Sequence, residues 1–230
     1  MNNKILIFLL FAVVVISLFS GCTKKDIITG EGEIKYIDLE GGFYGLISSD
    51  GSKYDPVNLP DEYKIDGLPV EFELYKIDGA VSIHMWGEIV YINEIHPVGT
   101  VGFMTNSFGC KNDTRSRDSD LDCIQYEFEN NKLNISHINA GFNCCPIFYS
   151  DLNVNNNIIT IVEVEVEGNC RCLCLFDLDF VVFNLEPGEY TFKFIEPYVD
   201  ATDEKIEFTV NLSSEPTGSF CVKRNYYPWD

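Results

Sequence analysis

The sequence predicts an all-β protein made of two modules. Apolar and polar residues alternate along many short segments, which is the period of a half-buried strand. Clusters of Gly, Asn, Asp and Pro separate these segments as turns, and no stretch after residue 22 repeats apolar residues at helical spacing. The alternation is lost between residues 98 and 121, so a linker there divides the chain in two.

The N-terminus has the features of a secretory signal. Lys4 precedes an apolar run from Ile5 to Phe19, which is shorter than the roughly 20 residues a spanning helix needs. We therefore expect a signal peptide helix over residues 1–21. The ending Phe19-Ser-Gly-Cys22 resembles a prokaryotic lipobox, in which the cysteine receives lipid and becomes the mature N-terminus. An uncleaved anchor is the alternative, and it gives the same topology.

This leader predicts a chain held at the extracytoplasmic face of the cell membrane, with residues 22–30 as a tether. The expected partners are the membrane, through lipid on Cys22, and an unknown protein or small ligand. The formal charge of −20 opposes nucleic acid as a partner, because an acidic surface repels phosphate. Glycosylation sequons occur at three positions: Asn112, Asn134 and Asn211.

Residues 31–97 predict a small OB-like β-barrel. Glu33–Asp38 and Val70–Lys76 alternate as strands, and Asp50-Gly51 and Asp78-Gly79 are turn signals. Five short strands in one small module are typical of a closed or partly open barrel. The module holds 4 Lys against 14 Asp and Glu, which argues against the oligonucleotide binding common in such barrels.

Two aromatic segments in this module invite two interpretations. Gly42-Phe-Tyr-Gly45 and His84-Met-Trp-Gly87 place aromatic residues beside glycines, as a ligand surface would. Aromatic residues on short strands more often belong to the core.

The predicted linker, residues 98–121, runs into three alternate aspartates, Asp118, Asp120 and Asp122, followed by Glu129. The spacing resembles an EF-hand loop, but Cys123 stands where glycine is required and a strand pattern follows. A calcium contact through the aspartates is therefore only an alternative.

Residues 122–230 predict an antiparallel, Ig-like β-sandwich. Leu133, Ile135 and His137 share one strand face, which makes His137 a candidate for a hydrogen-bonded core histidine. Val162, Val164 and Val166 alternate with glutamates in another strand. Seven or eight such strands separated by turns suit a sandwich.

Besides Cys22, eight cysteines remain, and an even number in an exported chain predicts disulfides. They are Cys110, Cys123, Cys144, Cys145, Cys170, Cys172, Cys174 and Cys221.

Their spacing restricts the pairing. On one strand Cys170, Cys172 and Cys174 would stand roughly 6.5 Å apart, more than the roughly 4 Å between bridged Cβ atoms. Each should therefore take a partner from the other five. Adjacent Cys144 and Cys145 should not pair with each other. Of the pairs left over, Cys110 with Cys123 is favoured because they bracket one loop.

A thiolate metal site is the alternative use of the cysteine cluster. Soft sulfur ligands suit Cu(I) or Zn, although the usual C-x-x-C spacing of structural zinc is absent. Redox-active thiols are a further alternative. The candidate ligands are Cys144, Cys145, Cys170, Cys172 and Cys174, with His137.

Two blocks resemble modules of uncharacterised prokaryotic exported lipoproteins. Gly41-Gly-Phe-Tyr-Gly-Leu-Ile, Asp55-Pro-Val-Asn-Leu-Pro and Ser82-Ile-His-Met-Trp-Gly resemble a small β-barrel module. His137-Ile-Asn-Ala-Gly-Phe-Asn-Cys-Cys and Cys170-Arg-Cys-Leu-Cys-Leu-Phe-Asp-Leu resemble a second, cysteine-rich module. The resemblance implies export and modularity and brings no activity with it.

The sequence contains no G-x-S-x-G elbow, H-E-x-x-H pair or phosphate-binding glycine loop. We therefore expect a non-enzymatic cell-surface lipoprotein with a binding or structural role and no cofactor. The alternative is a metal-binding or thiol-redox lipoprotein that uses the clustered cysteines. A surface hydrolase is a weaker third hypothesis, since abundant carboxylates could supply an acid–base pair.

Overall fold

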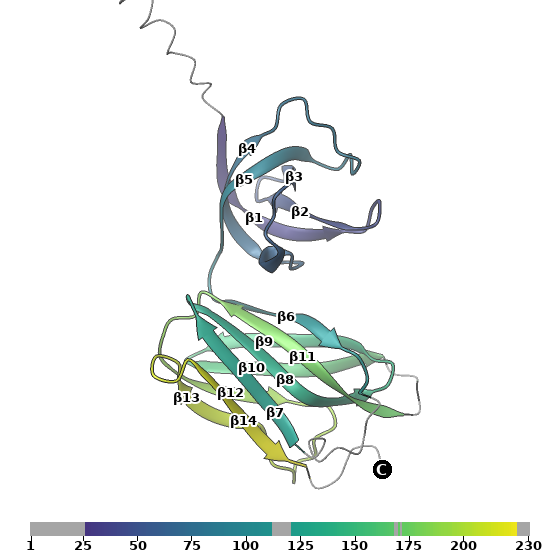
Figure 1. Ribbon diagram of the computed structural model, residues 1–230, viewed down its shortest axis with the longest axis vertical. Helices are drawn as coiled ribbons and strands as arrows, with labels where there is room; N and C mark the ends of the chain where they lie inside the picture. Colours follow the sequence, from purple (N-terminus) through teal and green to yellow (C-terminus); the bar gives the residue numbers. More distant parts are fainter. Residues whose placement is uncertain (1–25, 112–120, 168–169, 171, 225–230) are drawn as a thin grey trace, which may run out of the picture.

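The computed structural model describes residues 26–111, 121–167, 170 and 172–224. The predicted signal peptide, Cys22 and the sequon at Asn112 lie outside these residues. The described chain is all-β, as predicted, apart from one short 3-10 turn, η1 (Asp61–Tyr63). The described residues include no helix that is long and apolar enough to cross a membrane. Figure 1 shows a small barrel at one end of the molecule and a larger two-sheet body at the other.

The barrel has the five strands expected of an OB-like module. The strands are β1 (Ile27–Ile37), β2 (Phe43–Ser48), β3 (Lys53–Pro56), β4 (Pro69–Lys76) and β5 (Glu88–Pro97). They close in the order β1-β2-β3-β5-β4, and only β3 and β5 pair in parallel. Alternate residues point inward, so that Ile34, Leu46 and Leu74 are fully buried in a common core.

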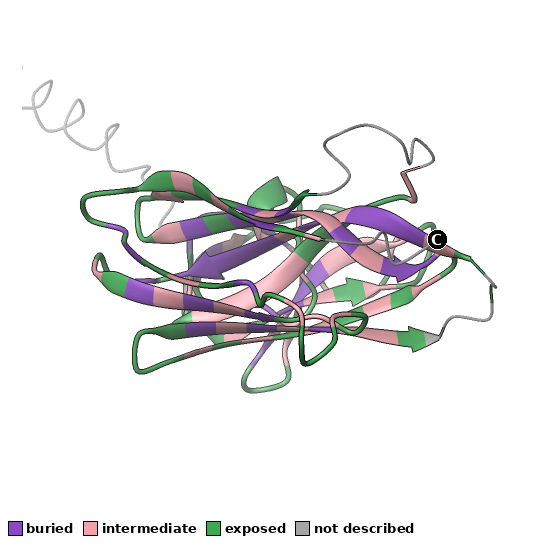
Figure 2. Ribbon diagram, turned by 90° about the horizontal axis from the view of Figure 1, so that it is seen from below, coloured by how far each residue is buried: buried purple, intermediate pink, exposed green. Residues whose placement is uncertain are grey.

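The sandwich consists of two packed sheets, confirming the predicted class. One sheet has the order β14-β7-β8-β11-β6 and the other β13-β12-β10-β9. The pairing is antiparallel except between β10 and β12. The strands are β6 (Val101–Phe108), β7 (Leu121–Glu129), β8 (Lys132–Asn143), β9 (Ile147–Asn155), β10 (Ile158–Glu167), β11 (Leu173–Phe183), β12 (Glu189–Ile195), β13 (Glu207–Asn211) and β14 (Thr217–Lys223). Figure 2 shows the buried stretches between the layers.

The predicted linker is wrong over most of its described length, because Val101–Phe108 forms β6 at the edge of the five-stranded sheet. The two faces of β6 contact different modules. Val101 and Phe103 pack against the barrel core, whereas Met104 packs against the sandwich core. Gly102 faces the sandwich, where a Cβ atom would collide with Leu152. Both faces of residues 101–104 therefore contact protein, whereas residues 105–108 are exposed, so apolar and polar residues do not alternate along β6.

The joint between barrel and sandwich is packed. Val181 and Phe183 of β11 belong to the apolar cluster that fills the barrel, and Phe183 lies 6.1 Å from the ring of Tyr63. The Nζ atom of Lys132 in the sandwich lies 2.7 Å from a carboxylate oxygen of Glu62 in the barrel. Asn184 donates hydrogen bonds to the carbonyls of Pro97 and Gly99 at 2.6 and 3.0 Å. The connection is therefore held on several sides.

Strand direction defines the two ends of the barrel. The amide of Val98, which leads into the sandwich, donates to the carbonyl of Pro69 at the start of β4. β4 thus runs away from the sandwich and ends at Lys76, and β5 runs back towards it. Ile27 at the start of β1 pairs with Tyr75. The start of β1 and the β4–β5 loop (residues 77–87) therefore lie at the end of the barrel away from the sandwich (Figure 1).

Candidate functional site

All eight candidate cysteines of the described chain form disulfides. The pairs are Cys110–Cys174, Cys123–Cys221, Cys144–Cys172 and Cys145–Cys170. As expected, Cys170, Cys172 and Cys174 each take a partner from the other five, and Cys144 and Cys145 do not pair with each other.

The favoured pair Cys110–Cys123 is wrong, because strand pairing brings other cysteines closer. β6 runs antiparallel to β11, so the chain leaving β6 at Cys110 meets Cys174 near the start of β11. β7 pairs with β14, and their register sets Cys123 opposite Cys221. Cys170 and Cys172 precede β11, so only Cys174 lies within the strand.

Two of the disulfides lie side by side. The Sγ atom of Cys174 lies 3.3 Å from that of Cys144, to which it is not bonded. The sulfurs of Cys110, Cys144 and Cys174 all lie within 4.8 Å of one another. Each is already bonded to a partner, so no thiolate of this group is available to a metal while the bridges are closed.

His137, the histidine predicted to assist a metal site, has a different role. Its side chain is fully buried between the sheets, and its Nδ1 atom lies 2.5 Å from an oxygen of Glu163. Its Nε2 atom lies 2.6 Å from an oxygen of Asp122. Since carboxylates occupy both ring nitrogens, neither nitrogen is free to join the cysteines. The predicted core histidine is thus confirmed, with two carboxylates as its partners.

A chain of buried titratable groups extends from Asp122 to Arg224, at the C-terminal end of the described chain. The guanidinium of Arg224 binds the second oxygen of Asp122, and it lies 2.8 Å from an oxygen of Glu196. Asp122 comes from β7, His137 from β8 and Glu163 from β10, so the network joins the two sheets. We refer to Asp122, His137, Glu163, Glu196 and Arg224 as the charge network.

The surroundings shift the pKa values of these groups. Burial alone lowers the pKa of His137, but the charges of Glu163 and Asp122 and their hydrogen bonds raise it well above its ordinary value. Burial, followed by the charge of Asp122, raises the pKa of Glu196 to about 8. The pKa of Asp122 is lowered despite its burial, because His137 is charged and hydrogen-bonded to it. A protonated His137 therefore sits between two carboxylates.

Glu163, Glu196 and Arg224 are the members of the network that sequence reasoning missed. Valine and glutamate do alternate along β10, but the first glutamate of this run, Glu163, lies on the face of the strand that points between the sheets. Glu163 is 3% exposed, whereas Val166 is 60% exposed. The Oε2 atom of Glu163 is buried and has no hydrogen-bond partner within the described chain. Asp122, one of the three aspartates whose spacing resembles an EF-hand loop, contacts His137 and Arg224 in the charge network. Asp118 and Asp120 lie outside the described residues.

The second cluster of titratable groups fixes the β4–β5 loop on the barrel. Asp55 of β3 is buried, and its Oδ2 atom accepts a hydrogen bond from the hydroxyl of Ser82 at 2.6 Å. The same oxygen lies 2.8 Å from Nδ1 of His84. The imidazole of His84 stacks on the ring of Phe43 with a centroid distance of 3.7 Å. These contacts join the two aromatic segments that the sequence singled out.

The same loop alternates between inward and outward side chains. Trp86 lies against Gly45 of β2, where a Cβ atom would collide with the indole, and its ring meets Phe43 edge-on. Between these inward residues, Val81, Ile83 and Met85 are 93%, 77% and 91% exposed. Met85 adopts φ = 43°, a left-handed conformation that is unusual for a bulky residue. The aromatic face is thus covered by the protein's own loop, which displays three apolar side chains.

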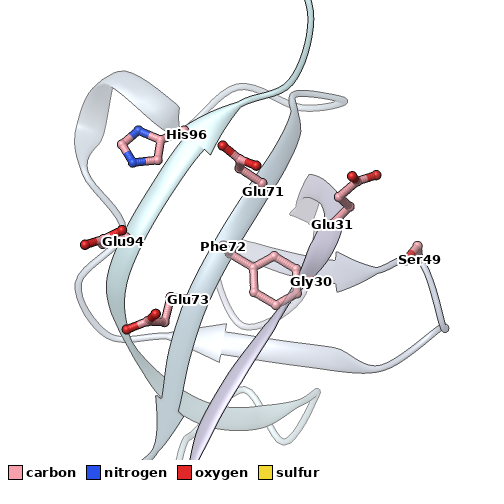
Figure 3. A pocket seen from close by; sticks show the side chains of 8 residues that line it. All are labelled: Gly30, Glu31, Ser49, Glu71, Phe72, Glu73, Glu94 and His96. Carbon is pink, nitrogen blue, oxygen red and sulfur yellow. The ribbon is translucent and has the colours of Figure 1, made fainter.

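A shallow acidic groove of about 600 Å³ runs along the outside of the barrel. Figure 3 shows its carboxylates on β1, β4 and β5, with His96 beside them. Glu31 is paired with Glu71 across two strands, and Glu73 with Glu94, so like charges stand opposite each other. The groove lining carries four glutamates: Glu31, Glu71, Glu73 and Glu94.

Two of the predicted glycosylation sites are on the described surface. Asn134 of β8 and Asn211 of β13 are both exposed. The Oδ1 atom of Asn211 accepts a hydrogen bond from the amide of Ser213 at 3.0 Å.

Comparison with known proteins gives no family. No family model matches the chain, and no curated protein matches it. Among solved structures, it is similar to a protein from Parabacteroides distasonis described only as toxin-related, at 14% identity and a TM-score of 0.28, over 81% of this chain and 94% of that one. It is also similar to a protein of unknown function from Bacteroides vulgatus, at 13% identity and a TM-score of 0.26, over 85% and 96%. These scores are too low to support an argument about function.

Proposed function

We propose that the protein is a non-enzymatic lipoprotein of the extracytoplasmic face of the cell membrane, tethered through Cys22, with a structural or binding role. The observation that carries this proposal is the packed joint, in which Val181 and Phe183 of the sandwich extend the apolar core of the barrel. Because β1 starts at the opposite end, a lipid on Cys22 would hold the barrel at the membrane. The barrel would then act as a spacer that presents the sandwich to the surroundings.

The disulfides support an exported protein. Four bridges within one module are typical of oxidising compartments and rare in a reducing cytosol.

The two places where a histidine meets a carboxylate support a structural use of these groups. His137 has both ring nitrogens bonded and no exposed surface, so a substrate cannot reach it. In the barrel, the hydroxyl of Ser82 donates to Asp55, the carboxylate that His84 also contacts. A nucleophile and its base would instead need the hydroxyl bonded to the imidazole.

The acidic groove supports the expectation that nucleic acid is not a partner. Its cross-strand glutamates would repel a phosphate backbone along one side of the barrel. A cationic or neutral ligand is compatible with the same surface.

Fractionation of cells tests the proposed tether. The wild-type protein should sediment with membranes and partition into detergent, whereas Cys22→Ser should appear in the soluble fraction or as an unprocessed precursor. Thr23→Ser is the matched control, since it changes the adjacent residue and keeps the thiol. Membrane retention of a cleaved Cys22→Ser protein would contradict the proposal.

A metal-binding or thiol-redox lipoprotein is the second candidate. It is favoured by one observation, the 3.3 Å separation of Cys144 and Cys174 sulfurs from two different bridges. Opening either bridge would place a thiolate beside the other, as disulfide exchange requires. Alkylation of the folded, unreduced protein separates the two candidates. We expect no modified cysteine in the disulfide-bonded scaffold, while labelling of four or more would favour the second function.

A further inference from the structure

The β4–β5 loop exposes three apolar side chains within five consecutive residues. Single exposed apolar residues are common, but contiguous ones mark contact with a partner or a membrane. Val81, Ile83 and Met85 occupy alternate positions, and each is more than three-quarters exposed. Of the eleven residues in the loop, only Asp78 carries a formal charge. The loop is thus both apolar and poor in charge, within a strongly acidic module.

The residues between and after these three apolar side chains hold the loop against the barrel. Ser82 and His84 bind the buried carboxylate of Asp55, and Trp86 packs on Gly45. With its inward side chains fixed, the loop cannot turn its apolar residues into the barrel. Met85 also keeps a positive φ while its side chain points to solvent. Such a conformation persists only where the surrounding structure imposes it.

The position of the loop on the barrel indicates which surface it would contact. Ile27 pairs with Tyr75 beside the end of β4, so the chain enters the barrel at the end where the loop lies. Cys22 is five residues before Ile27, and five extended residues span at most about 18 Å. Ile27 itself is 61% exposed. A lipid on Cys22 would therefore bring the bilayer to this end of the barrel.

We infer that the β4–β5 loop is a second membrane contact, in which Val81, Ile83 and Met85 enter the interface of the bilayer to which Cys22 is anchored. The inference rests on the tether proposed above. Its chemistry is apolar insertion, as for proteins that lie on a membrane rather than span it. The acidic barrel would repel anionic headgroups, so the surface that fits is a zwitterionic phospholipid. The loop would orient the barrel, and with it the sandwich, relative to the membrane.

Oxidation of Met85 tests this inference with the native sequence. The full lipoprotein is reconstituted in phosphatidylcholine vesicles, separated by flotation and treated with hydrogen peroxide. Sulfoxide formation at Met85 and Met104 is then followed by mass spectrometry. The reference is the Cys22→Ser protein without residues 1–21, in solution. We expect Met85 to oxidise several-fold more slowly on vesicles than in solution. Met104, which packs inside the sandwich, should oxidise at the same rate in both.

A matched pair of substitutions checks the cause of the protection. Ile83→Asp places a charge in the contact and should restore fast oxidation of Met85 on vesicles, whereas Ile147→Asp, on the exposed surface of the sandwich, should not. Equal Met85 rates on vesicles and in solution, for protein that floats, would overturn the loop contact and leave the tether standing. Failure to float would overturn both. Protection that rises with the protein-to-lipid ratio would mean contact with a second copy and would also overturn the inference.

Discussion

The Nδ1 atom of His84 lies 2.8 Å from the Oδ2 atom of Asp55, and this pair ties the β4–β5 loop to strand β3. The carboxylate is buried, so its hydrogen bonds are made where water competes weakly. The same oxygen also accepts a hydrogen bond from the hydroxyl of Ser82. Asp55 therefore holds two residues of the loop at once, in addition to the packing of His84 on Phe43 and of Trp86 on Gly45.

Replacing Asp55 should release the loop and leave the barrel folded. Asp55→Ala removes two hydrogen bonds to a charged group, each worth about 1.5–3 kcal/mol. We expect faster amide hydrogen exchange over residues 78–87 and little change in β1 and β4. Asp78→Ala, in the same loop but exposed, is the control. Exchange that stays slow in the loop of Asp55→Ala would show that other contacts hold it.

Removing His137 should destabilise the sandwich strongly. His137→Leu leaves Asp122 and Glu163 buried without the cation between them, and breaking a buried ion pair costs about 3–5 kcal/mol. Urea denaturation measures the loss of unfolding free energy. His96→Leu, which changes an exposed histidine of the barrel, should alter stability by less than about 0.5 kcal/mol. A loss for His137→Leu as small as that of the control would contradict the network's structural role.

The charge network should make the sandwich less stable at alkaline pH. The pKa values of His137 and Glu196 are raised in the folded state, so folding retains protons that the unfolded chain releases. Their stabilisation is complete below the unfolded pKa values and is lost as pH rises through the folded ones. For Glu196 this window runs from its ordinary value of 4.5 to about 8. For His137 it starts near 6.5 and extends upward.

At the acid end Asp122 acts in the opposite direction, because its pKa is lowered on folding and its stabilisation is lost as pH falls below 3.8. Thermal unfolding followed from pH 3 to pH 10 should therefore show a maximum on the mildly acidic side. Glu196→Gln should flatten the decline between about pH 5 and pH 8. A midpoint that rises from pH 6 to pH 9 would contradict the assigned protonation states.

The Cys123–Cys221 bridge should stabilise the sandwich more than a short-loop bridge does. It links residues 98 positions apart and ties β14 to β7. On the chain-entropy model a loop of this length is worth about 4.7 kcal/mol, and measured losses are typically about 2–5 kcal/mol. The double substitution Cys123→Ala with Cys221→Ala should cost more than Cys145→Ala with Cys170→Ala, whose loop spans 25 positions. The reverse order, measured by urea denaturation, would argue against an entropic origin.

The sequence predicted the class of each module well where one strand face meets solvent. The barrel strands around Ile34 and Leu74 alternate clearly, because their outer faces are polar and exposed. The prediction failed at β6, where both faces of residues 101–104 contact protein and residues 105–108 are exposed, so the period of two disappears. β11 shows the same effect, since Phe180 and Val182 face the sandwich core while Val181 and Phe183 face the barrel.

The sites were predictable only in part, for reasons of tertiary pairing. Cys170, Cys172 and Cys174 do not pair among themselves, as predicted, although only Cys174 lies on a strand as the spacing argument assumed. Only the register of β7 with β14 could reveal the pair Cys123–Cys221. His137 was expected in the core from its apolar neighbours. Its partner Glu163 lies 26 positions away on the other sheet, where local sequence gives no sign of it.

The intact mass of the protein extracted from membranes tests the central claim, an exported, lipid-anchored scaffold closed by disulfides. The account predicts a chain that begins at Cys22 and carries lipid on that residue. Its mass should be lower by about two units for each of the four bridges, because each bond loses two hydrogens. A chain that retains residues 1–21, or one that lacks lipid and has free thiols, would contradict it.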